Sequence, residues 1–304
     1  MTTSVRLRDV TLRDGLQLTG KLLGTDTKVE LARVLLDAGV DALEVGAMAR
    51  PDKVPPMANT LEVIEALTSE ELQRCWVWTA SPRGITRAIE AGARNVEYCL
   101  SVSDQHNCAN VGRTTEHSMA ALPEAVDFAA VAGAQLQLSL ATAFSCPYSG
   151  EVDPQRVVDL VCDSRAADIS SVVLCDTLGQ ATPEQVRQLV KRVRDVAPER
   201  EIVFHGHDTW GLGVANTIAA IQAGAAMVDG ALGGLGGCPF APGASGNTST
   251  EDLLFALQPS WLTPPVFAGI VTAGGRLLDE LGEPNRSRAA EGARSTVDAF
   301  PWVT

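Results

Sequence analysis

The sequence predicts an α/β protein that forms a closed (β/α)8 barrel with a C-terminal helical extension. A short apolar or β-branched run, a turn and a segment of helical periodicity recur eight times between residues 5 and 257. Alternation of apolar strands with helices is typical of parallel sheets that helices cover. Eight such units, over about 250 residues, favour a closed TIM barrel over an open doubly wound sheet.

Each unit is placed by the spacing of its apolar residues. In the first helix, the apolar residues 29, 31, 32, 35 and 36 lie on one side. Four helices end in Ala-Gly, which suits a left-handed C-cap before the next strand, at Gly39, Gly92, Gly133 and Gly224. The predicted strands are residues 5–12, 41–45, 75–79, 95–100, 134–140, 171–175, 201–205 and 227–231. The helices that follow them are residues 27–38, 59–67, 84–91, 116–131, 154–166, 183–196, 213–223 and 249–257.

The repeat divides the chain into a barrel domain, residues 1–260, and a C-terminal cap, residues 261–304. Residues 268–281 have the pattern of one more helix, and the polar tail that follows ends in an aromatic Phe-Pro-Trp run. We expect the cap to pack on the barrel or to form a contact in a homodimer.

Composition and charge exclude several classes of protein. The net charge of −13 argues against nucleic acid or an anionic membrane as a partner. The first residues contain no apolar signal region, and no run approaches the ~18 apolar residues of a membrane helix. Seven cysteines without a C-x-x-C pair indicate reduced thiols and no structural zinc site. We therefore expect a cytoplasmic protein.

A pair of histidines, His205 and His207, is the first candidate for chemistry. If residues 202–207 form a strand, both imidazoles lie on one face of it, because side chains alternate. Two imidazoles on one face can share a divalent metal ion. For an isolated H-x-H pair, two histidines satisfied by core hydrogen bonds remain the alternative.

The other unusual residues fall at the carboxyl ends of the predicted strands, where (β/α)8 barrels carry their active sites. Arg13 and Asp14 follow the first strand, Glu44 ends the second, and Asp176 ends the sixth. Taken singly, Arg13-Asp14 could be a charged turn and Asp176 could cap a loop. Glu44 lies between two apolar residues, so it must be paired if it is buried.

A glycine-rich segment, residues 233–247, follows the eighth strand and contains Cys238 and Asn247. Asp14, the two histidines and the Asn247 carbonyl would offer one carboxylate, two imidazoles and one amide oxygen. This set suits Mg²⁺ or Mn²⁺, with Zn²⁺ or Co²⁺ as alternatives. No thiolate is needed as a ligand, so Cys238 is free to act as an acid or base, in a loop whose glycines allow it to move.

Several motifs resemble the hydroxymethylglutaryl-CoA lyase branch of the metal-dependent, DRE-type TIM-barrel lyases and synthases. The similarity extends from about residue 5 to residue 257. The segment GLGGCPFAPGASGN is its most specific part, since the R-D-G start alone would indicate only the wider superfamily. The matching segments are residues 11–17 (TLRDGLQ), 146–148 (CPY), 176–179 (DTLG), 205–209 (HGHDT), 233–247 and 250–252 (TED).

The resemblance implies a role for each candidate residue. Asp14, His205, His207 and Asn247 match the family's metal ligands. Arg13 matches the arginine that stabilises an enolate oxygen, and Cys238 matches the mobile-loop cysteine. Glu44 and Asp176 match acidic residues that position the substrate.

The implied reaction is retro-Claisen cleavage of 3-hydroxy-3-methylglutaryl-CoA, or of a close 3-hydroxy-acyl-CoA analogue, to acetyl-CoA and a keto acid. A bound metal ion would lower the pKa of the 3-hydroxyl group. His205, or Asp14 through a water molecule, would accept the proton. Arg13 would face the enolate oxygen, and Cys238 would protonate the enolate carbon.

Other functions stay open because the loops at the mouth of the barrel depart from the family pattern. These departures are Leu18-Thr19-Gly20-Lys21, Gly46-Ala47-Met48 and the region of residues 101–112. The same residues could support a Claisen-type condensation of an acyl-CoA with a 2-oxo acid, or an aldol cleavage. A barrel that serves only as a binding subunit is the non-enzymatic alternative, against which the intact candidate residues argue.

Binding of CoA requires cations for its phosphates. The rim loops offer Lys21, Arg50, Lys53 and Arg83, although each also suits a solvated surface. His106 and His117, near the fourth strand, are predicted to be ordinary surface histidines.

Overall fold

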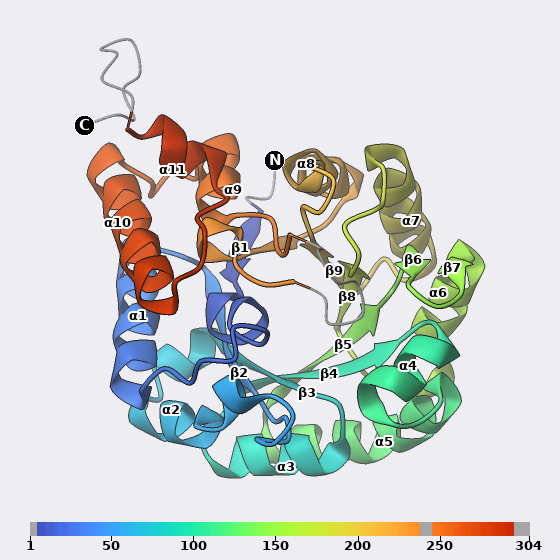
Figure 1. Ribbon diagram of the computed structural model, residues 1–304. Helices are drawn as coiled ribbons and strands as arrows, with labels where there is room; N and C mark the ends of the chain where they lie inside the picture. Colours follow the sequence, from blue (N-terminus) through green and yellow to red (C-terminus); the bar gives the residue numbers. More distant parts are fainter. Residues whose placement is uncertain (1–4, 238–244, 295–304) are drawn as a thin grey trace.

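Eight parallel strands close into a barrel surrounded by helices, which confirms the predicted fold class (Figure 1). The computed structural model describes residues 5–237 and 245–294. The strands follow one another around the barrel in the order β1-β10-β9-β8-β5-β4-β3-β2. Their bounds are Arg6–Asp9 (β1), Ala42–Ala47 (β2), Cys75–Thr79 (β3), Asn95–Ser101 (β4), Gln135–Ala141 (β5), Ser171–Asp176 (β8), Glu201–Gly206 (β9) and Met227–Gly230 (β10).

Most of the surrounding helices begin and end close to the predicted positions, but the helix predicted at 154–166 ends at Val161 and a separate 3-10 turn follows at Ser164–Ala166. Several begin at a side-chain cap, such as the capping box of Thr182 and Gln185. The predicted left-handed C-caps are confirmed, with φ of 108° at Gly39 and 66° at Gly133. The helices are Thr25–Ala38 (α1), Thr60–Ala66 (α2), Pro82–Glu90 (α3), Asp104–Val111 (α4), Thr115–Ala132 (α5), Pro154–Val161 (α6), Pro183–Val196 (α7), Gly213–Ala223 (α8) and Thr250–Leu257 (α9).

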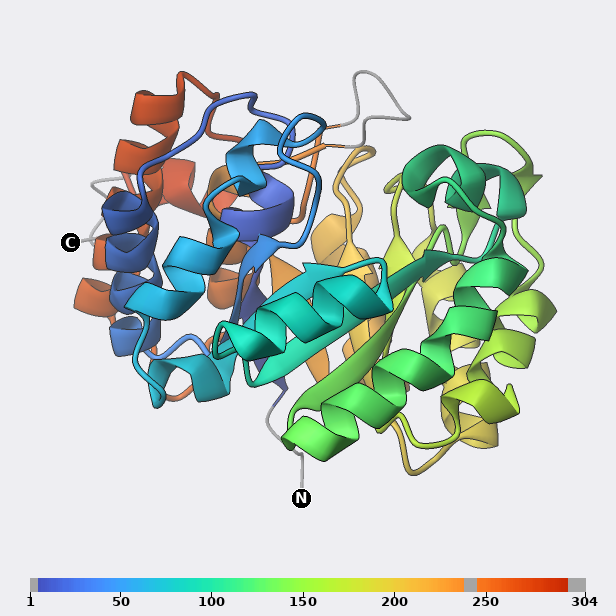
Figure 2. The ribbon, with the colours of Figure 1, turned by 90° about the horizontal axis from the view of Figure 1, so that it is seen from below.

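The first strand is shorter than predicted, because Thr11–Gly15 forms a single π-helical turn. The Asp9 carboxylate accepts a hydrogen bond from the Thr11 amide at 2.9 Å, and the Gly15 amide donates to the Val10 carbonyl. This turn directly follows the carboxyl end of β1, the dark blue strand in Figure 2. It therefore carries Asp14 to the carboxyl ends of the strands.

Several short elements were not predicted, among them a helix and a hairpin in two of the connections. Helix α4 occupies part of the loop after β4, and Ser145–Cys146 (β6) pairs with Gly150–Glu151 (β7) in a small antiparallel hairpin. Both lie in connections whose residues have no clear helical or strand periodicity.

The C-terminal region adds α10 (Pro264–Leu281), which packs against α1 and α9, and α11 (Arg288–Gly292), which packs against α9 (Figure 1). The helix predicted at 268–281 is confirmed, but it begins earlier, at Pro264, a favourable first helical residue. The division of the chain at residue 260 stays a prediction. Among the described helices, none combines the length and apolar character needed to cross a membrane.

The barrel interior holds a layer of charged side chains beside a small apolar cluster, whereas the main apolar core lies between the strands and the helices. Arg8, Glu44, Glu97 and Asp229 are all at least 98% buried inside the barrel. Arg8 donates to both carboxylate oxygens of Asp229, at 2.9 and 2.7 Å. Because unpaired buried charges are costly, such pairing is required for these residues to lie there.

A glycine supports the backbone of the candidate metal site. Gly179 has φ of +62°, and an added Cβ would lie 2.8 Å from the His207 carbonyl oxygen. We expect Gly179→Ala to lower the free energy of unfolding by about 2 kcal/mol, measured by urea denaturation. The matched control is Gly133→Ala, where φ is +66° but nothing lies within 4 Å, so only about 1 kcal/mol should be lost. Equal losses would contradict the steric argument.

Candidate active site

A cavity of about 620 Å³ opens at the carboxyl ends of the strands. Its wall includes Arg13, Asp14, Glu44, His205 and His207, so the fold brings together five of the predicted site residues. Asp176 and Asn247 are buried beside the cavity rather than in its described wall. Cys238 lies outside the described residues.

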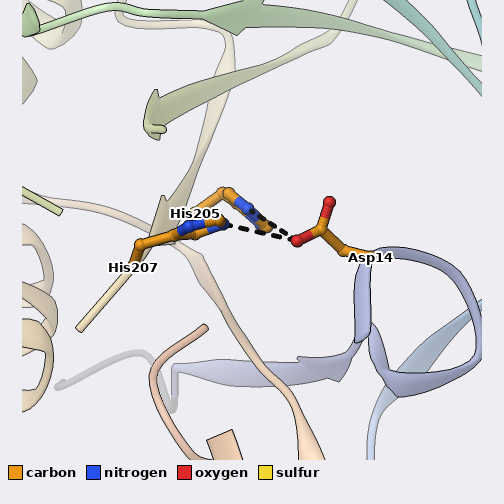
Figure 3. A group of neighbouring side chains, drawn as sticks. All are labelled: Asp14, His205 and His207. Carbon is orange, nitrogen blue, oxygen red and sulfur yellow. Dashed lines mark ion pairs between the residues drawn. The ribbon is translucent and has the colours of Figure 1, made fainter. Parts of the chain in front are cut away.

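Asp14, His205 and His207 form a cluster that could hold a metal ion (Figure 3). Asp14 comes from the π-helical turn, and the two histidines come from the end of β9 and the residue after it. His207 Nε2 lies 3.3 Å, and His205 Nε2 4.0 Å, from Asp14 Oδ2. One ligand atom from each residue lies within 4.8 Å of the others, which matches the expected convergence.

Asn247 lies beside this cluster and leaves an acceptor unused. Its Nδ2 donates to Asp14 Oδ2 and to the Leu235 carbonyl, both at 2.9 Å. Within the described part of the chain, the buried Asn247 Oδ1 and His207 Nδ1 have no hydrogen-bond partner. Buried polar atoms seldom stay unsatisfied. The free amide oxygen, with a carboxylate and two imidazoles, fits a divalent cation.

Asp14 is held in its charged form. Burial alone would raise its pKa, but Arg13, His207 and His205 outweigh that effect and lower the pKa well below its usual range. Gln17 also donates to Asp14 Oδ1 at 2.7 Å. A carboxylate must be ionised to bind a metal ion, so this environment suits a ligand.

The guanidinium of Arg13 is fixed from three sides. It contacts Asp14, its Nε lies 3.4 Å from Glu44 Oε2, and it lies 4.8 Å over the ring of Trp78. Its side chain is 11% exposed, and it lines the cavity. A rigid cation in a buried wall can stabilise negative charge that develops on a bound substrate.

Glu44 is buried and paired, as its apolar neighbours in the sequence required. Burial raises the pKa of Glu44 to about 8, with repulsion from Glu97, although the attraction of Arg13 and Arg8 opposes the shift. The guanidiniums of Arg8 and Arg13, 3.5 and 3.4 Å from the two oxygens of Glu44, offset part of the cost of burying this carboxyl group.

A model of the HMGL-like family matches residues 4–266, which is most of the chain. The chain belongs to the HMGL-like family. The expected resemblance is thereby confirmed.

The HMGL-like chain is similar over nearly all of its length to curated lyases. It is 35% identical to (R)-citramalyl-CoA lyase of Chloroflexus aurantiacus, with 92% of each chain covered. It is 32% identical to the mitochondrial hydroxymethylglutaryl-CoA lyase of Arabidopsis thaliana over 97% of its own length, and it spans 64% of that relative. The expected enzyme class, a carbon–carbon lyase, is confirmed.

A solved structure of an HMG-CoA lyase from Acinetobacter baumannii, in complex with coenzyme A and 3-methylmalate, has the same fold. Its TM-score is 0.88 and its identity is 33%, with 99% of this chain and 98% of that chain covered.

Three residues of this HMGL-like site were missed in the sequence. Arg8, Glu97 and Asp229 lie within strands β1, β4 and β10, and Asp229 Oδ2 lies 3.0 Å from His205 Nδ1. A charged residue between two apolar neighbours in a predicted strand is the signal that could have identified Glu97, whereas Arg8 and Asp229 each have an apolar neighbour on one side only. The same signal drew attention to Glu44.

The prediction for His106 is wrong. It is 98% buried on α4, its Nδ1 lies 2.7 Å from Ser101 Oγ, and it lines the cavity. Burial lowers the pKa of His106 to about 4, so the ring is neutral at physiological pH. The unpredicted helix α4 explains the error, because it places this residue inside the rim. His117 is exposed, as predicted.

Asp176 holds the loop after β8. Its two carboxylate oxygens accept hydrogen bonds from the amides of Gln180 and Ala181, both at 3.1 Å. Its side chain therefore fixes the backbone beside His207, whose amide donates to the Asp176 carbonyl at 3.3 Å. A role in positioning the substrate stays a proposal.

Of the candidate cations at the rim, Arg50 and Lys53 line the mouth of the cavity. Lys21 instead donates to the Leu281 carbonyl, and Arg83 is an exposed residue outside the cavity wall. The last described residue before Cys238, Gly237, also lines the cavity.

Glu251, on α9, makes stability depend on pH. Burial raises the pKa of Glu251 from 4.5 to about 7, although hydrogen bonds from Ser249 and the Gly233 amide oppose the shift. A carboxyl whose pKa is raised by folding contributes stability below its unfolded pKa, and this contribution is lost as the pH rises through the folded pKa. Relative to Glu251→Gln, we expect the wild-type free energy of unfolding to fall by about 2–3 kcal/mol between about pH 4.5 and pH 8. Urea denaturation across this range checks it, and a constant difference would contradict it.

Proposed function

We propose that the protein is a divalent-metal-dependent acyl-CoA lyase that cleaves 3-hydroxy-3-methylglutaryl-CoA, or a close 3-hydroxy-acyl-CoA analogue, by a retro-Claisen reaction. The observation that carries this proposal is the Asp14, His205 and His207 cluster beside Arg13 in one cavity. The names of the curated relatives and the coenzyme A in the related solved structure support an acyl-CoA substrate.

The chemistry follows from where charge develops. Cleavage removes the proton of the 3-hydroxyl group, breaks the bond between C2 and C3, and leaves the enolate of acetyl-CoA. A divalent cation held by Asp14, His205, His207 and Asn247 would supply Lewis acidity to the substrate oxygens. Arg13 stabilises the enolate oxygen as negative charge develops there.

Of the two expected acceptors, His205 has both ring nitrogens engaged, Nδ1 with Asp229 and Nε2 at the metal site. The proton of the hydroxyl therefore leaves to a water molecule beside Asp14, whose depressed pKa lets the proton pass on to solvent. Glu44 orients the guanidinium of Arg13, whose Nε lies 3.4 Å from Glu44 Oε2.

Cys238 is the proposed donor of the proton that converts the enolate to acetyl-CoA. We expect Cys238→Ala to lower kcat by about 100-fold or more while the affinity for the metal stays unchanged. Matched control variants at the described cysteines Cys108 and Cys162, both exposed, should keep full activity. Full activity of Cys238→Ala would refute this role.

A second candidate substrate is (R)-citramalyl-CoA, which is favoured by the 35% identity to the lyase named for it. Cleavage between C2 and C3 of citramalyl-CoA gives pyruvate with acetyl-CoA, whereas hydroxymethylglutaryl-CoA gives acetoacetate. The two substrates place different groups on the same carbinol carbon, so one set of catalytic residues serves both.

The deciding experiment incubates the purified protein and Mg²⁺ or Mn²⁺ with each CoA ester, and follows acetoacetate and pyruvate separately. Release of one product selects the substrate. A further reaction containing acetyl-CoA and each keto acid tests the condensing alternative. If the metal-loaded protein neither cleaved nor formed any of these esters, the proposed function would be wrong.

The metal, the oligomeric state and the cellular location each have a separate test. Titration with Mg²⁺, Mn²⁺, Co²⁺ and Zn²⁺ ranks the metals, for which Mg²⁺ or Mn²⁺ is our proposal. Light scattering tests the proposed homodimer, and fractionation of the source cells tests the proposed cytoplasmic location.

A further inference from the structure

Six side chains, five of them buried and Arg13 11% exposed, form a ring at the candidate metal site in which carboxyl groups alternate with basic groups. The nearest oxygen and nitrogen atoms of successive members lie no more than 4.0 Å apart, and the ring links the metal ligands with the guanidinium of Arg13. In order, the members are Asp14, Arg13, Glu44, Arg8, Asp229 and His205.

On one side of the ring, Arg8 positions Asp229, which in turn contacts the candidate metal ligand His205. Its Nε and Nη2 donate to Asp229 at 2.9 and 2.7 Å, and Asp229 Oδ2 lies 3.0 Å from His205 Nδ1. A hydrogen bond at Nδ1 fixes the tautomer and the rotation of an imidazole whose Nε2 binds a metal. The two-pronged contact with Arg8 fixes Asp229 in turn.

On the other side of the ring, Arg8 contacts Glu44, which in turn contacts Arg13. Its Nη2 lies 3.5 Å from Glu44 Oε1, and the other oxygen of Glu44 lies 3.4 Å from Arg13 Nε. The same guanidinium therefore supports both arms of the ring. Its Nη1 donates to Glu97 at 3.1 Å and to Gln137 at 2.9 Å, which anchors it to β4 and β5.

Arg8 does not touch the cavity itself. It is 99% buried and lies outside the described cavity wall, whereas the other five members of the ring line that wall. It can therefore influence the reaction only through its neighbours.

We propose that Arg8 is a positioning residue of the active site, which orients the metal ligand His205 through Asp229 and the guanidinium of Arg13 through Glu44. The inference rests on the proposed metal-dependent lyase function. It predicts that a single substitution at Arg8 changes both the affinity for the metal and kcat. A substitution at Asp229 should change mainly the affinity, and one at Glu44 mainly kcat.

The test compares three variants of the full chain, with Co²⁺ as the metal probe. Asp229→Asn should weaken Co²⁺ binding about 10–100-fold and alter the Co²⁺ absorption spectrum. Glu44→Gln should lower kcat while leaving Co²⁺ affinity within about threefold, because it acts on Arg13. Arg8→Lys keeps the charge but cannot contact both arms in the same way, so it should reproduce both effects.

A double-mutant cycle separates positioning from general stability. If Arg8 acts on the metal through Asp229, adding Asp229→Asn to Arg8→Lys should weaken Co²⁺ binding by less than about threefold more. The matched control is Gln137→Met, which removes a partner of Arg8 from the same buried layer without touching Asp229 or Glu44. It should leave the Co²⁺ spectrum unchanged. Melting temperatures of all variants monitor folding.

If Arg8→Lys does not fold, the double variant Arg8→Gln/Glu97→Gln replaces it in the test, because this variant removes one positive and one negative charge together. If the wild-type protein binds Co²⁺ and the Arg8 variants match it in Co²⁺ affinity, absorption spectrum and kcat, the proposed role of Arg8 is wrong but the proposed function stands. The role of Arg8 is also wrong if the losses of Co²⁺ affinity caused by Arg8→Lys and Asp229→Asn simply add in the double variant. Wild-type protein that binds no Co²⁺ would overturn the proposed function, and this inference with it.

Discussion

His207→Ala is expected to weaken binding of Mn²⁺ or Co²⁺ by at least about 100-fold and to abolish lyase activity. His207 supplies one of two imidazoles in the cluster, and its Nε2 lies 3.3 Å from Asp14. Loss of a supporting residue of a metal site already costs about 10–100-fold in affinity, so loss of a ligand should cost more. Isothermal titration calorimetry measures the affinity directly.

His117→Ala is the matched control for this experiment, because it removes an exposed histidine elsewhere in the same chain. Its affinity for the metal should equal that of the wild type. A His207→Ala protein that bound the metal as tightly as the control would refute the ligand set.

Arg13→Gln is expected to lower kcat by about 100–1,000-fold, because it removes the cation that faces the enolate oxygen. The glutamine keeps hydrogen-bonding capacity toward Asp14 and Glu44 but carries no charge. Steady-state kinetics on the cleaved CoA ester measures the loss, which should fall mainly on kcat and less on KM.

The control is Arg33→Gln, which breaks a half-exposed ion pair with Glu71 on the outer surface. Exposed ion pairs contribute little to stability, so activity should stay within about twofold. If Arg13→Gln retained the activity of this control, Arg13 would not stabilise the transition state.

The local elements could be predicted closely because their signals are local. Residues 183–196 and 213–223 form helices at the predicted bounds, and 75–79 forms the predicted strand. The errors arose where contacts distant in sequence override local pattern. Residues 10–12 were predicted to continue β1, but Thr11–Gly15 forms a π-helical turn. Thr11 Oγ1 accepts a hydrogen bond from the Leu232 amide at 2.8 Å, and Asp9 Oδ2 accepts one from Thr250 Oγ1 at 2.5 Å.

The candidate site could be predicted in part. Asp14, His205 and His207 follow strands whose carboxyl ends must meet at one end of a barrel, so their convergence was expected. Glu44 was recognised as a buried charge that needs a partner, but the sequence could not say which. Its partners are Arg8 and Arg13, on and after the neighbouring strand.

By itself, the sequence determined the barrel and the end of it that carries the chemistry, because periodicity and strand order are written along the chain. Only the tertiary structure decided which charges inside the barrel pair with one another. Arg8 and Asp229 are 221 residues apart and become neighbours because closure of the barrel places β10 beside β1. Pairing of buried charges depends on distances between strands, and no local pattern in the sequence contains those distances.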